Sequence, residues 1–348
     1  MAGAAADELT VRRPLSFARC LAKLLALAVT TPIRRLLGYK PPVDGWTIQH
    51  EIAVAFLRYS LVTDNASARR NESRLIYIAN LQLKTQLVPM EAPGFRGVWY
   101  GGPTNDADAT ILYLHGGGYA LCDSATYALA NHAIQVTAST TSGKHVRVLG
   151  LEYSLAPEAK FPTQMNEALA AYSYLANDSN KPIVLMGDSA GGHLVLQLLL
   201  ALKTPEWSHL RKPQASVAVS PWCQMNLSPL PISYTTNSAT DYVQLINIRH
   251  YNNDLLPDNV SVTNPSLNPL NGDFRGTGPV LVHYGGKEVF ASEIEQLVEV
   301  LQRQDVDVTV VKEPLAPHIT PMLPSFFGAM AVKGQQTIGK YIGQHVNS

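Results

Sequence analysis

The sequence predicts an α/β protein built on one mostly parallel sheet that is flanked by helices. From residue 85 onward, short apolar segments alternate with stretches of helical spacing, which is typical of a sheet crossed by helices. Several apolar segments are nearly continuous runs, as in strands that are buried on both faces. The 348 residues are 46% hydrophobic and 16% charged, which gives an ordinary globular composition and enough length for one large domain or two small ones.

Each part of this alternation has an expected element. The predicted strands cover residues 85–89, 95–100, 110–115, 145–153, 181–187, 215–221, 278–286 and 306–314. The predicted helices cover residues 124–140, 162–177, 190–202 and 291–304. The second helix begins at a proline, which the first turn of a helix accepts because the missing N–H has no partner there. The first two strands are expected to form a hairpin.

Two segments fall outside the alternation and predict a helical cap over the sheet. Residues 1–80 are helical in pattern, and a helix over 44–62 starts behind Asp44, a typical N-cap residue. Residues 222–275 are rich in Pro, Asn and Ser and contain a short helical stretch at 241–253. Insertions of this length commonly form lids, and α/β sheets bind ligands at the carboxyl ends of their strands. We therefore expect an N-terminal cap or anchor region over 1–80 and a main domain over 81–348.

An apolar run near the N-terminus is flanked by basic residues. Residues 24–33 are uncharged, and the neighbouring basic residues are Arg12, Arg13, Arg19, Lys23, Arg34 and Arg35. The run is well short of the roughly 20 residues needed to span a bilayer, and acidic residues at positions 7 and 8 disfavour a signal peptide. The pattern predicts a basic amphipathic helix within residues 12–37 that packs on the fold as a cap or contacts a membrane surface peripherally.

The charge balance and the cysteines limit the classes of partner. Lys plus Arg and Asp plus Glu both number 27, so the formal charge is zero, whereas nucleic acid binding needs a basic surface. A neutral, apolar substrate fits this composition better. Cys20, Cys122 and Cys223 stand far apart and lack the spacing of metal ligands, which favours reduced thiols in a cytoplasmic protein.

The stretch GDSAGG, residues 187–192, predicts a sharp turn between a strand and a helix with a serine at its apex. Ser189 has a glycine two places before it and another two places after it, with apolar residues on either side of the stretch. Glycines at these places prevent collisions with the backbone in a strained strand-to-helix turn. The pattern fits G-x-S-x-G, so Ser189 is the candidate nucleophile and Asp188 a candidate supporting residue.

A base and an acid are expected after the late strands, because in such sheets the chain order is serine, acid, histidine. A serine hydroxyl needs an adjacent base at neutral pH, and only His318 and His345 follow these strands. His345 lies near the C-terminus, where disorder is the default, whereas His318 lies among four prolines that favour a fixed loop. We therefore predict His318 as the base. Glu288, the first carboxylate after strand 278–286, is the predicted acid, and Glu293 is its rival.

The stretch HGGGY, residues 115–119, predicts a site for a developing negative charge. Three successive glycines after a buried strand leave backbone N–H groups free to converge on an oxyanion. Gly117 and Gly118 are the predicted donors, and Ala190 adds a third at the start of its helix, where the helix dipole favours an anion. His115 and Gly116 are expected to support the loop.

These motifs resemble those of the hormone-sensitive-lipase branch of the α/β-hydrolases. The resemblance covers residues 108 to 330 approximately, and rests on HGGGY at 115–119, EYSLAPEAKFP at 152–162, GDSAGG at 187–192, SPW at 220–222, GGKE at 285–288, and His318. It implies an α/β-hydrolase fold with an N-terminal helical cap and a Ser-acid-His triad that needs no metal or organic cofactor. Glu288 departs from the aspartate that is common in this branch. The long N-terminal region looks more like that of steryl-acetate hydrolases and of pathway esterases of secondary metabolism.

The resulting expectation is a serine carboxylester hydrolase that acts on a small or medium apolar ester with an acetyl or short acyl group. Tyr119, Tyr153 and Trp222 are expected to line its substrate pocket. The first alternative is an acyltransferase, cyclase or lyase of a biosynthetic pathway that uses the same triad. The second is a ligand receptor without activity, since a fold does not fix a function. The sequence does not specify the oligomeric state.

Overall fold

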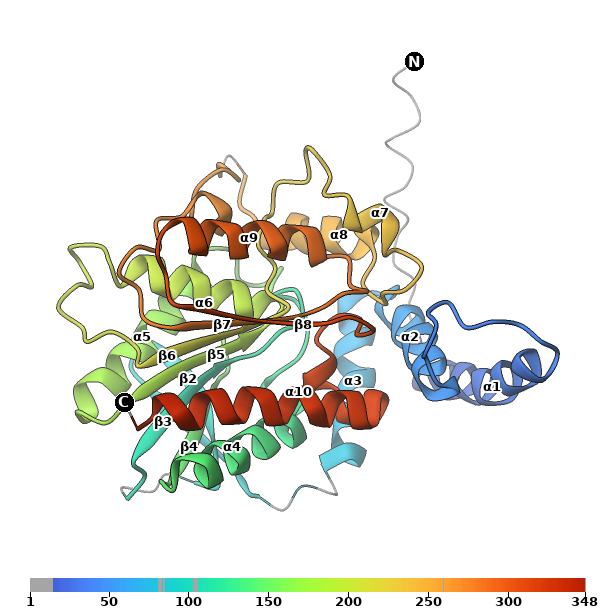
Figure 1. Cartoon of the computed structure of the whole chain (residues 1–348), viewed down its shortest axis with the longest axis horizontal. Coiled ribbons are helices and arrows are strands. Elements are labelled where there is room, and N and C mark those ends of the chain that lie inside the picture. The colour runs from blue at the N-terminus through green and yellow to red at the C-terminus, as the bar shows by residue number, and fades with distance from the viewer. Residues whose placement is uncertain (1–14, 81–82, 84, 103–105, 259, 348) are drawn as a thin grey trace.

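The computed structural model describes residues 15–80, 83, 85–102, 106–258 and 260–347. In this part of the chain, eight strands form one sheet in the order β1-β2-β4-β3-β5-β6-β7-β8 (Figure 1). The strands are β1 Leu87–Ala92, β2 Phe95–Tyr100, β3 Ala109–Leu114, β4 Val146–Leu151, β5 Ile183–Asp188, β6 Ala215–Val219, β7 Val280–Gly285 and β8 Val308–Glu313. The β1–β2 and β2–β4 pairs are antiparallel and the other pairs are parallel. Strands β3 to β7 are buried along their whole length, which explains their continuous apolar runs.

Helices cover both faces of the sheet, with α4 and α10 on one face and α6 and α9 on the other (Figure 1). The helices of the described residues are α1 Phe17–Leu36, α2 Ile48–Leu61, α3 Asn65–Asn80, α4 Ala128–Ser142, α5 Thr163–Asp178, α6 Ala190–Ala201, α7 Ser233–Thr236, α8 Leu245–Leu255, α9 Ala291–Arg303 and α10 Pro324–His345. The mostly parallel α/β architecture predicted from the alternation is therefore confirmed, and its strands and helices lie within a few residues of their predicted ends.

The C-terminal helix α10 was not predicted, and the expectation of disorder near His345 is wrong. Pro324 occupies the first turn, where a proline costs nothing, and the helix packs along α4. Glycines let the two helices approach closely: a Cβ at Gly339 would lie 2.5 Å from Cβ of Thr137. The helix is stable because of this tertiary contact, while its glycine-rich sequence has poor intrinsic helix propensity.

The N-terminal helices differ from the prediction at one cap. Helix α2 begins after Thr47 and not behind Asp44, because the Thr47 hydroxyl accepts a hydrogen bond from the amide of His50 at 3.3 Å. The His50 ring nitrogen in turn accepts one from the amide of Thr47 at 3.3 Å, which completes a capping box. Asp44 lies in the turn before this cap.

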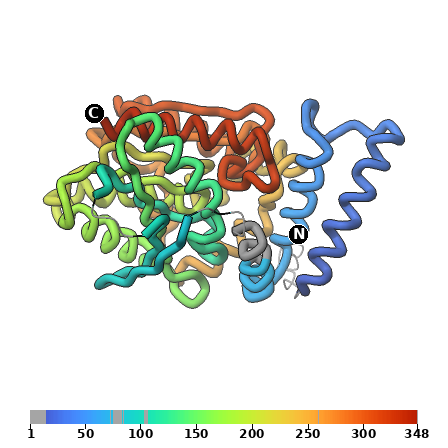
Figure 2. Tube along the Cα trace, turned by 90° about the horizontal axis from the view of Figure 1, so that it is seen from below, coloured from blue at the N-terminus to red at the C-terminus, as the bar shows by residue number. Residues whose placement is uncertain are grey.

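Helix α1 stands out from the body of the fold and packs on α2 (Figure 1 and Figure 2). Its N-cap is Ser16, so the amphipathic helix predicted within residues 12–37 starts at Phe17, and Arg12 and Arg13 lie outside the described residues. In the described ranges, no helix is both long enough and apolar enough to cross a membrane.

Candidate active site

Ser189 lies at the apex of a tight turn between β5 and α6. Its backbone has φ 52° and ψ −117°, a region that residues with side chains rarely adopt. The turn needs glycine nearby, because a Cβ at Gly191 would lie 1.9 Å from the carbonyl oxygen of Leu114 in β3. The amide of Ser189 donates to the carbonyl of Val219 at 2.9 Å, which ties the turn to β6. The hydroxyl is thus held at the carboxyl ends of the central strands.

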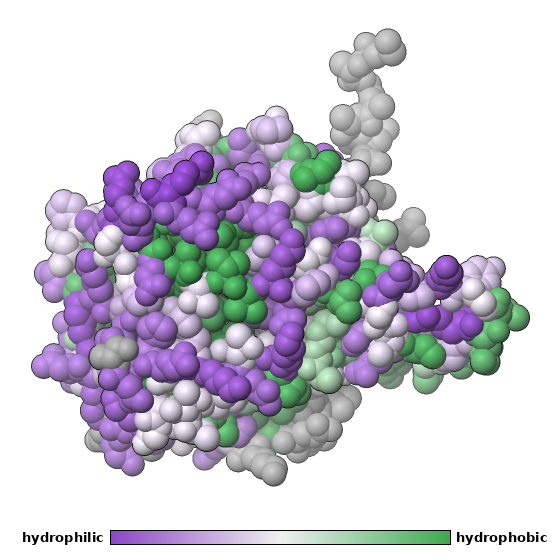
Figure 3. Space-filling view, viewed as in Figure 1, coloured by the Kyte–Doolittle hydropathy of each residue, from purple (hydrophilic) through white to green (hydrophobic). Residues whose placement is uncertain are grey.

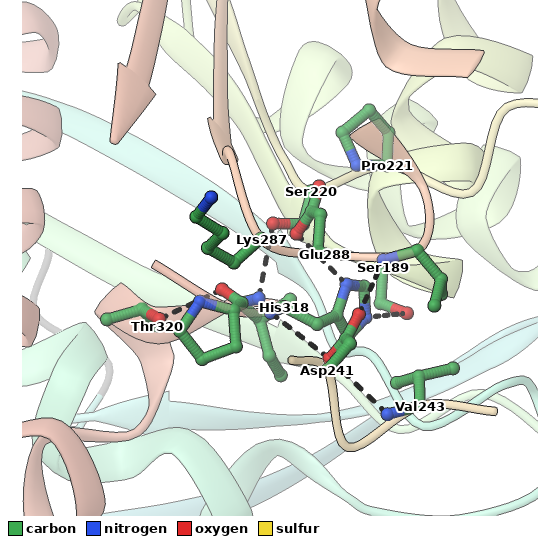
Figure 4. Close-up of polar contacts among 12 residues, drawn as sticks. Ser189, Ser220, Pro221, Asp241, Val243, Lys287, Glu288, His318 and Thr320 are labelled. Atoms are coloured by element: carbon green, nitrogen blue, oxygen red, sulfur yellow. Dashed lines mark hydrogen bonds and ion pairs between the residues drawn. The ribbon is translucent and has the colours of Figure 1, made fainter. Parts of the chain in front are cut away.

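His318 and Glu288 reach Ser189 from the loops that follow β8 and β7 (Figure 4). The Nε2 atom of His318 lies 2.9 Å from Oγ of Ser189. On the other side of the ring, Nδ1 of His318 lies 3.3 Å from Oε2 of Glu288. The glutamate side chain is fully buried and the imidazole nearly so. Serine, imidazole and carboxylate therefore form a continuous row of side chains.

Burial sets the protonation of this row. It lowers the pKa of His318 to about 4 against the opposing charge of Asp241, so the imidazole is neutral at pH 7 and its Nε2 can accept a proton. Burial also raises the pKa of Glu288 to about 8. The imidazole is therefore neutral before a reaction. Once it takes a proton, its positive charge lowers the pKa of the adjacent Glu288 carboxyl, so the glutamate can meet the imidazolium as an anion.

The alternative histidine and glutamate lie elsewhere. Glu293 accepts hydrogen bonds from the amide of Cys223 at 2.8 Å and from the hydroxyl of Tyr234 at 2.9 Å. His345 is at the end of α10, where its ring bonds to the carbonyl of Tyr341 at 2.8 Å. The structure thus brings His318 and Glu288 to Ser189, and neither Glu293 nor His345.

The glycine loop after β3 lies beside the serine. Gly117 has φ 106° and Gly118 has φ 62°, and within the described part of the chain no acceptor pairs with their amides. The amide of Ala190 opens α6, where first-turn N–H groups lack partners in the helix. Gly117, Gly118 and Ser189 line the same cavity. Gly117 and Gly118 therefore border the space next to the serine hydroxyl, and Ala190 follows the serine directly in the chain.

The predicted supporting residues anchor this loop from behind. Asp188 accepts hydrogen bonds on Oδ1 from the amide of Gly116 at 3.1 Å and from the hydroxyl of Tyr113 at 2.5 Å. Burial raises the pKa of Asp188 to about 7. His115 stacks on Tyr153 with ring centroids 4.0 Å apart, and its Nδ1 lies 2.7 Å from the carbonyl oxygen of Gly116.

The cavity in front of Ser189 has a volume of about 250 Å³ and a mostly apolar wall. Helices α1, α2 and α3, the 222–275 insertion, the residue before α9, and the start of α10 with the turn before it contribute to this wall. The residues include Cys20, Phe56, Leu57, Ala68, Trp222, Tyr242, Ile248, Tyr251, Phe290, Met322 and Phe326. The N-terminal helices and the insertion thus enclose the space together.

Of the three predicted pocket residues, only Trp222 lines the cavity. Tyr119 and Tyr153 are buried behind the glycine loop and not at the cavity wall. The hydroxyl of Tyr119 bonds to Nδ1 of His193 at 2.7 Å, and that of Tyr153 donates to the carbonyl of His115 at 2.8 Å. Tyr119 belongs to the 115–119 motif and Tyr153 to the 152–162 motif, and neither motif indicates which side of the glycine loop its ring occupies.

Two polar residues at the site were missed from the sequence. The buried Asp241 of the 222–275 insertion accepts a hydrogen bond from the amide of His318 at 3.4 Å. The hydroxyl of Ser220, which follows β6 with φ 45°, accepts one from the amide of Ile319 at 3.1 Å. Ser220 belongs to the SPW stretch and could have been suspected from it, whereas Asp241 lies in no motif.

In the described ranges, no group of three or more His, Cys, Asp and Glu side chains is arranged to hold a metal ion. No disulfide joins the three cysteines, of which Cys20 and Cys223 are buried.

Comparison with known proteins places this geometry in a family. A family described as having the alpha/beta hydrolase fold matches residues 111–322. An acetyl-hydrolase of Streptomyces hygroscopicus is 30% identical over 242 residues, which cover 67% of this chain and 76% of that protein. An esterase of Acinetobacter venetianus is 29% identical over 231 residues, which cover 64% of this chain and 71% of that protein.

A solved structure agrees over most of the fold. An esterase from the bacterial hormone-sensitive lipase family superposes with a TM-score of 0.77 at 27% identity, and the match covers 87% of this chain and 99% of that one. The match extends well beyond the motifs. The chain belongs to the α/β-hydrolase fold family and, within it, to the hormone-sensitive-lipase-like esterases.

Proposed function

We propose that this chain is a serine carboxylesterase in which Ser189, His318 and Glu288 form the catalytic triad. The Ser189 hydroxyl oxygen attacks the ester carbonyl carbon while its proton passes to Nε2 of His318. Glu288 holds the ring through Nδ1 and stabilises the imidazolium. The imidazolium then protonates the departing alkoxide, which leaves an acyl-serine. Water, deprotonated by His318, then attacks the acyl carbon. The bond from this carbon to Oγ of Ser189 breaks, the imidazolium returns its proton to Oγ, and the carboxylic acid leaves.

The tetrahedral intermediates carry an oxyanion, for which we propose the amides of Gly117, Gly118 and Ala190 as donors. Donors that are fixed before the reaction stabilise the charge without reorganising, and the loss of one such donor typically costs on the order of 10²–10³ in rate. The observation that carries the proposal is the 2.9 Å contact between His318 Nε2 and Ser189 Oγ, made at the wall of an apolar cavity beside these amides.

The cavity supports an apolar ester with a short acyl group as substrate. Its wall is mostly apolar, and its volume of about 250 Å³ suits a small or medium ligand. The acetyl-hydrolase among the relatives supports an acetyl or similarly short acyl group. We propose that residues 1–80 and 222–275 act as the cap of the catalytic domain, because side chains of α1–α3 and of the insertion close the cavity around the serine.

The cap over Ser189 also supports the alternative of acyl transfer to an alcohol, since a site that keeps water out protects an acyl-serine from hydrolysis. Product analysis separates the two reactions: hydrolysis releases the free acid, whereas transfer yields a new ester. Binding of an apolar ester without either product would instead support the receptor.

The test uses a panel of p-nitrophenyl esters of increasing acyl length with the wild type and Ser189→Ala. We expect the acetyl and butyryl esters to be the best substrates, and Ser189→Ala to abolish turnover without lowering the melting temperature. Ser325→Ala, at another serine of the cavity wall, is the matched control and should retain activity. Undiminished turnover by Ser189→Ala would refute the assignment.

We propose further that this esterase is cytoplasmic and that it contacts a membrane surface through α1. The helix carries a row of exposed apolar side chains, with Leu25, Val29 and Leu36 exposed to 68%, 60% and 87%. Apolar side chains gather along one side of this projecting region (Figure 3). Within residues 15–43 the charged residues are all basic: Arg19, Lys23, Arg34, Arg35 and Lys40. An apolar stripe flanked by basic groups suits the surface of an anionic bilayer.

Vesicle flotation tests this contact. The wild type should float with vesicles that contain 30% anionic lipid, and much less with neutral vesicles. Leu25→Asp combined with Val29→Asp should abolish flotation while turnover of a water-soluble ester is retained. Val136→Asp, on the exposed face of α4, makes the same chemical change away from α1 and should float like the wild type. Equal flotation of the α1 variant would exclude this surface.

A further inference from the structure

Asp241 is a buried carboxylate that joins the loops of the candidate triad. Its Oδ2 accepts a hydrogen bond from the amide of Val289, the residue after Glu288, at 2.7 Å. Its Oδ1 accepts from the amide of His318 at 3.4 Å. The same oxygen accepts from the amides of Tyr242 and Val243 at 2.7 and 3.3 Å. One side chain thus connects the histidine loop, the acid loop and the insertion (Figure 4).

The N-terminal region holds Asp241 in place. Arg58 of α2 donates from Nε to the backbone carbonyl of Asp241 at 3.2 Å. Its Nη2 donates to the same carbonyl and to the carbonyls of Ser238 and Ala239, at 2.9 and 3.0 Å for the last two. The guanidinium therefore fixes the turn at residues 238–241 from the side of the cap. The contacts run from α2 through this turn to the base.

The charge of Asp241 acts on the same histidine. The groups that interact electrostatically with this carboxylate are His318, Glu288, Arg58, Tyr234 and Tyr242. Both carboxylate oxygens accept backbone N–H groups, which only the ionised form can do at full strength. Burial raises the pKa of Asp241 to about 6, which leaves it ionised at pH 7 and above. The negative charge of Asp241 raises the pKa of His318 against the effect of burial.

We propose that Asp241 is a positioning residue of the esterase reaction, which fixes His318 relative to Glu288 and stabilises the imidazolium. It touches neither substrate nor Ser189 in this role. The carboxylate of Asp241 stays ionised throughout, and the proton taken from Ser189 resides on His318 until the leaving group receives it. Arg58 makes this arrangement depend on the N-terminal region. The inference rests on the proposed triad and adds a fourth side chain to it.

The central variant is Asp241→Asn, which keeps the size of the side chain. The asparagine side chain carries no charge. Its NH₂ group has to face either the backbone N–H of Val289 or the backbone N–H groups that donate to Oδ1 in the wild type, and a donor cannot accept those hydrogen bonds. We expect kcat to fall on the order of 10- to 100-fold at pH 8, with KM changed little, as for the loss of a charged hydrogen bond. Asp258→Asn, at an exposed aspartate of the same insertion, is the matched control and should leave kcat unchanged.

The pH dependence separates positioning by the charged group from a purely structural role. The wild type loses the charge of Asp241 as the pH falls through about 6. The ratio of the wild-type kcat to that of Asp241→Asn should therefore shrink toward 1 between pH 8 and pH 5. A constant ratio over this range, or an unchanged kcat at pH 8, would overturn the proposal.

Two further measurements keep the result interpretable. Labelling by a fluorophosphonate reports on Ser189 directly: if the wild type is not labelled there, the proposed function fails. If the wild type is labelled and Asp241→Asn is labelled equally fast, only the role of Asp241 fails. Should Asp241→Asn not fold, Arg58→Lys decides, because it keeps the charge but loses the fork of donors. A kcat several-fold below that of the wild type supports the linkage, and an unchanged kcat refutes it.

Discussion

Gly118→Ala tests whether the glycine loop supplies oxyanion donors, because the structure predicts how the substitution displaces them. Gly118 has φ 62°, and a Cβ there would lie 2.4 Å from Cδ2 of Tyr251, against 3.4 Å for an ordinary contact. An alanine in the left-handed region costs about 1–2 kcal/mol in stability. Forcing a buried ring or the loop itself to retreat costs about 1–3 kcal/mol more.

Gly143→Ala is the matched control for the backbone strain. Gly143 ends α4 with φ 68°, and a Cβ there would have nothing within 4 Å. This control should lower the free energy of unfolding by about 1–2 kcal/mol and leave kcat unchanged. Gly118→Ala should lower the same quantity by about 2–5 kcal/mol. It should also lower kcat on the order of 10²-fold, because the amide moves away from the oxyanion.

Urea unfolding and p-nitrophenyl acetate turnover measure both quantities on the same preparations. Combining Gly118→Ala with Tyr251→Ala removes the ring that the new Cβ meets, so kcat should recover to within about tenfold of the Tyr251→Ala single variant. If Gly118→Ala kept the wild-type kcat while losing stability, the amide would not be a donor. If kcat fell but the second substitution restored nothing, the clash would not be the cause.

Three more outcomes follow from buried side chains. Glu288→Gln should lower kcat on the order of 10²-fold or more, whereas Glu293→Gln should stay within about twofold because glutamine can keep both hydrogen bonds; the reverse order would exchange the two roles. Burial raises the pKa of Glu293 to about 8, so its protonated form stabilises the fold at low pH and this stability is lost as the pH rises from about 4.5 to 8. The melting temperature of Glu293→Gln should gain on the wild type between pH 5 and pH 9, and a constant difference would contradict this. Gly339→Ala should destabilise the fold by about 1–3 kcal/mol through its contact with Thr137, and an unchanged urea midpoint would show that α10 can shift.

The elements of the fold that could be predicted are those in which the pattern of residue types along the chain follows from local burial. The parallel strands are apolar throughout because they are covered on both faces, and the turn at Ser189 has glycines because the backbones there approach closely. Helix α10 escaped prediction because its stability comes from packing against α4, which its sequence does not reveal. The cap at Thr47 was missed because Asp44, three residues earlier, is an equally good capping type.

The same distinction applies to the site. Ser189, His318 and Glu288 lie in stretches whose spacing to strand ends can be read from the sequence, and the structure brings these three side chains together. The place of Asp241 cannot be read from its spacing to a strand end, because it lies in an insertion whose path depends on Arg58 and on the loops it contacts. A buried carboxylate that binds amides from three segments can be found only once those segments are placed in space.

Asp188 and Asp241 are buried carboxylates that differ in how their two oxygens are used. This difference explains why only Asp241 has to stay charged. Asp188 holds the glycine loop with Oδ1 alone, and within the described residues its Oδ2 has no hydrogen-bond partner. A proton on Oδ2 therefore leaves the contact to Gly116 intact, and Asp188 can anchor the loop in either form. Asp241 accepts amides on both oxygens, so a proton on either one breaks a contact to a loop of the triad. Because of this difference, burial can neutralise Asp188 without consequence for the geometry, while Asp241 has to stay an anion for His318 to remain in position.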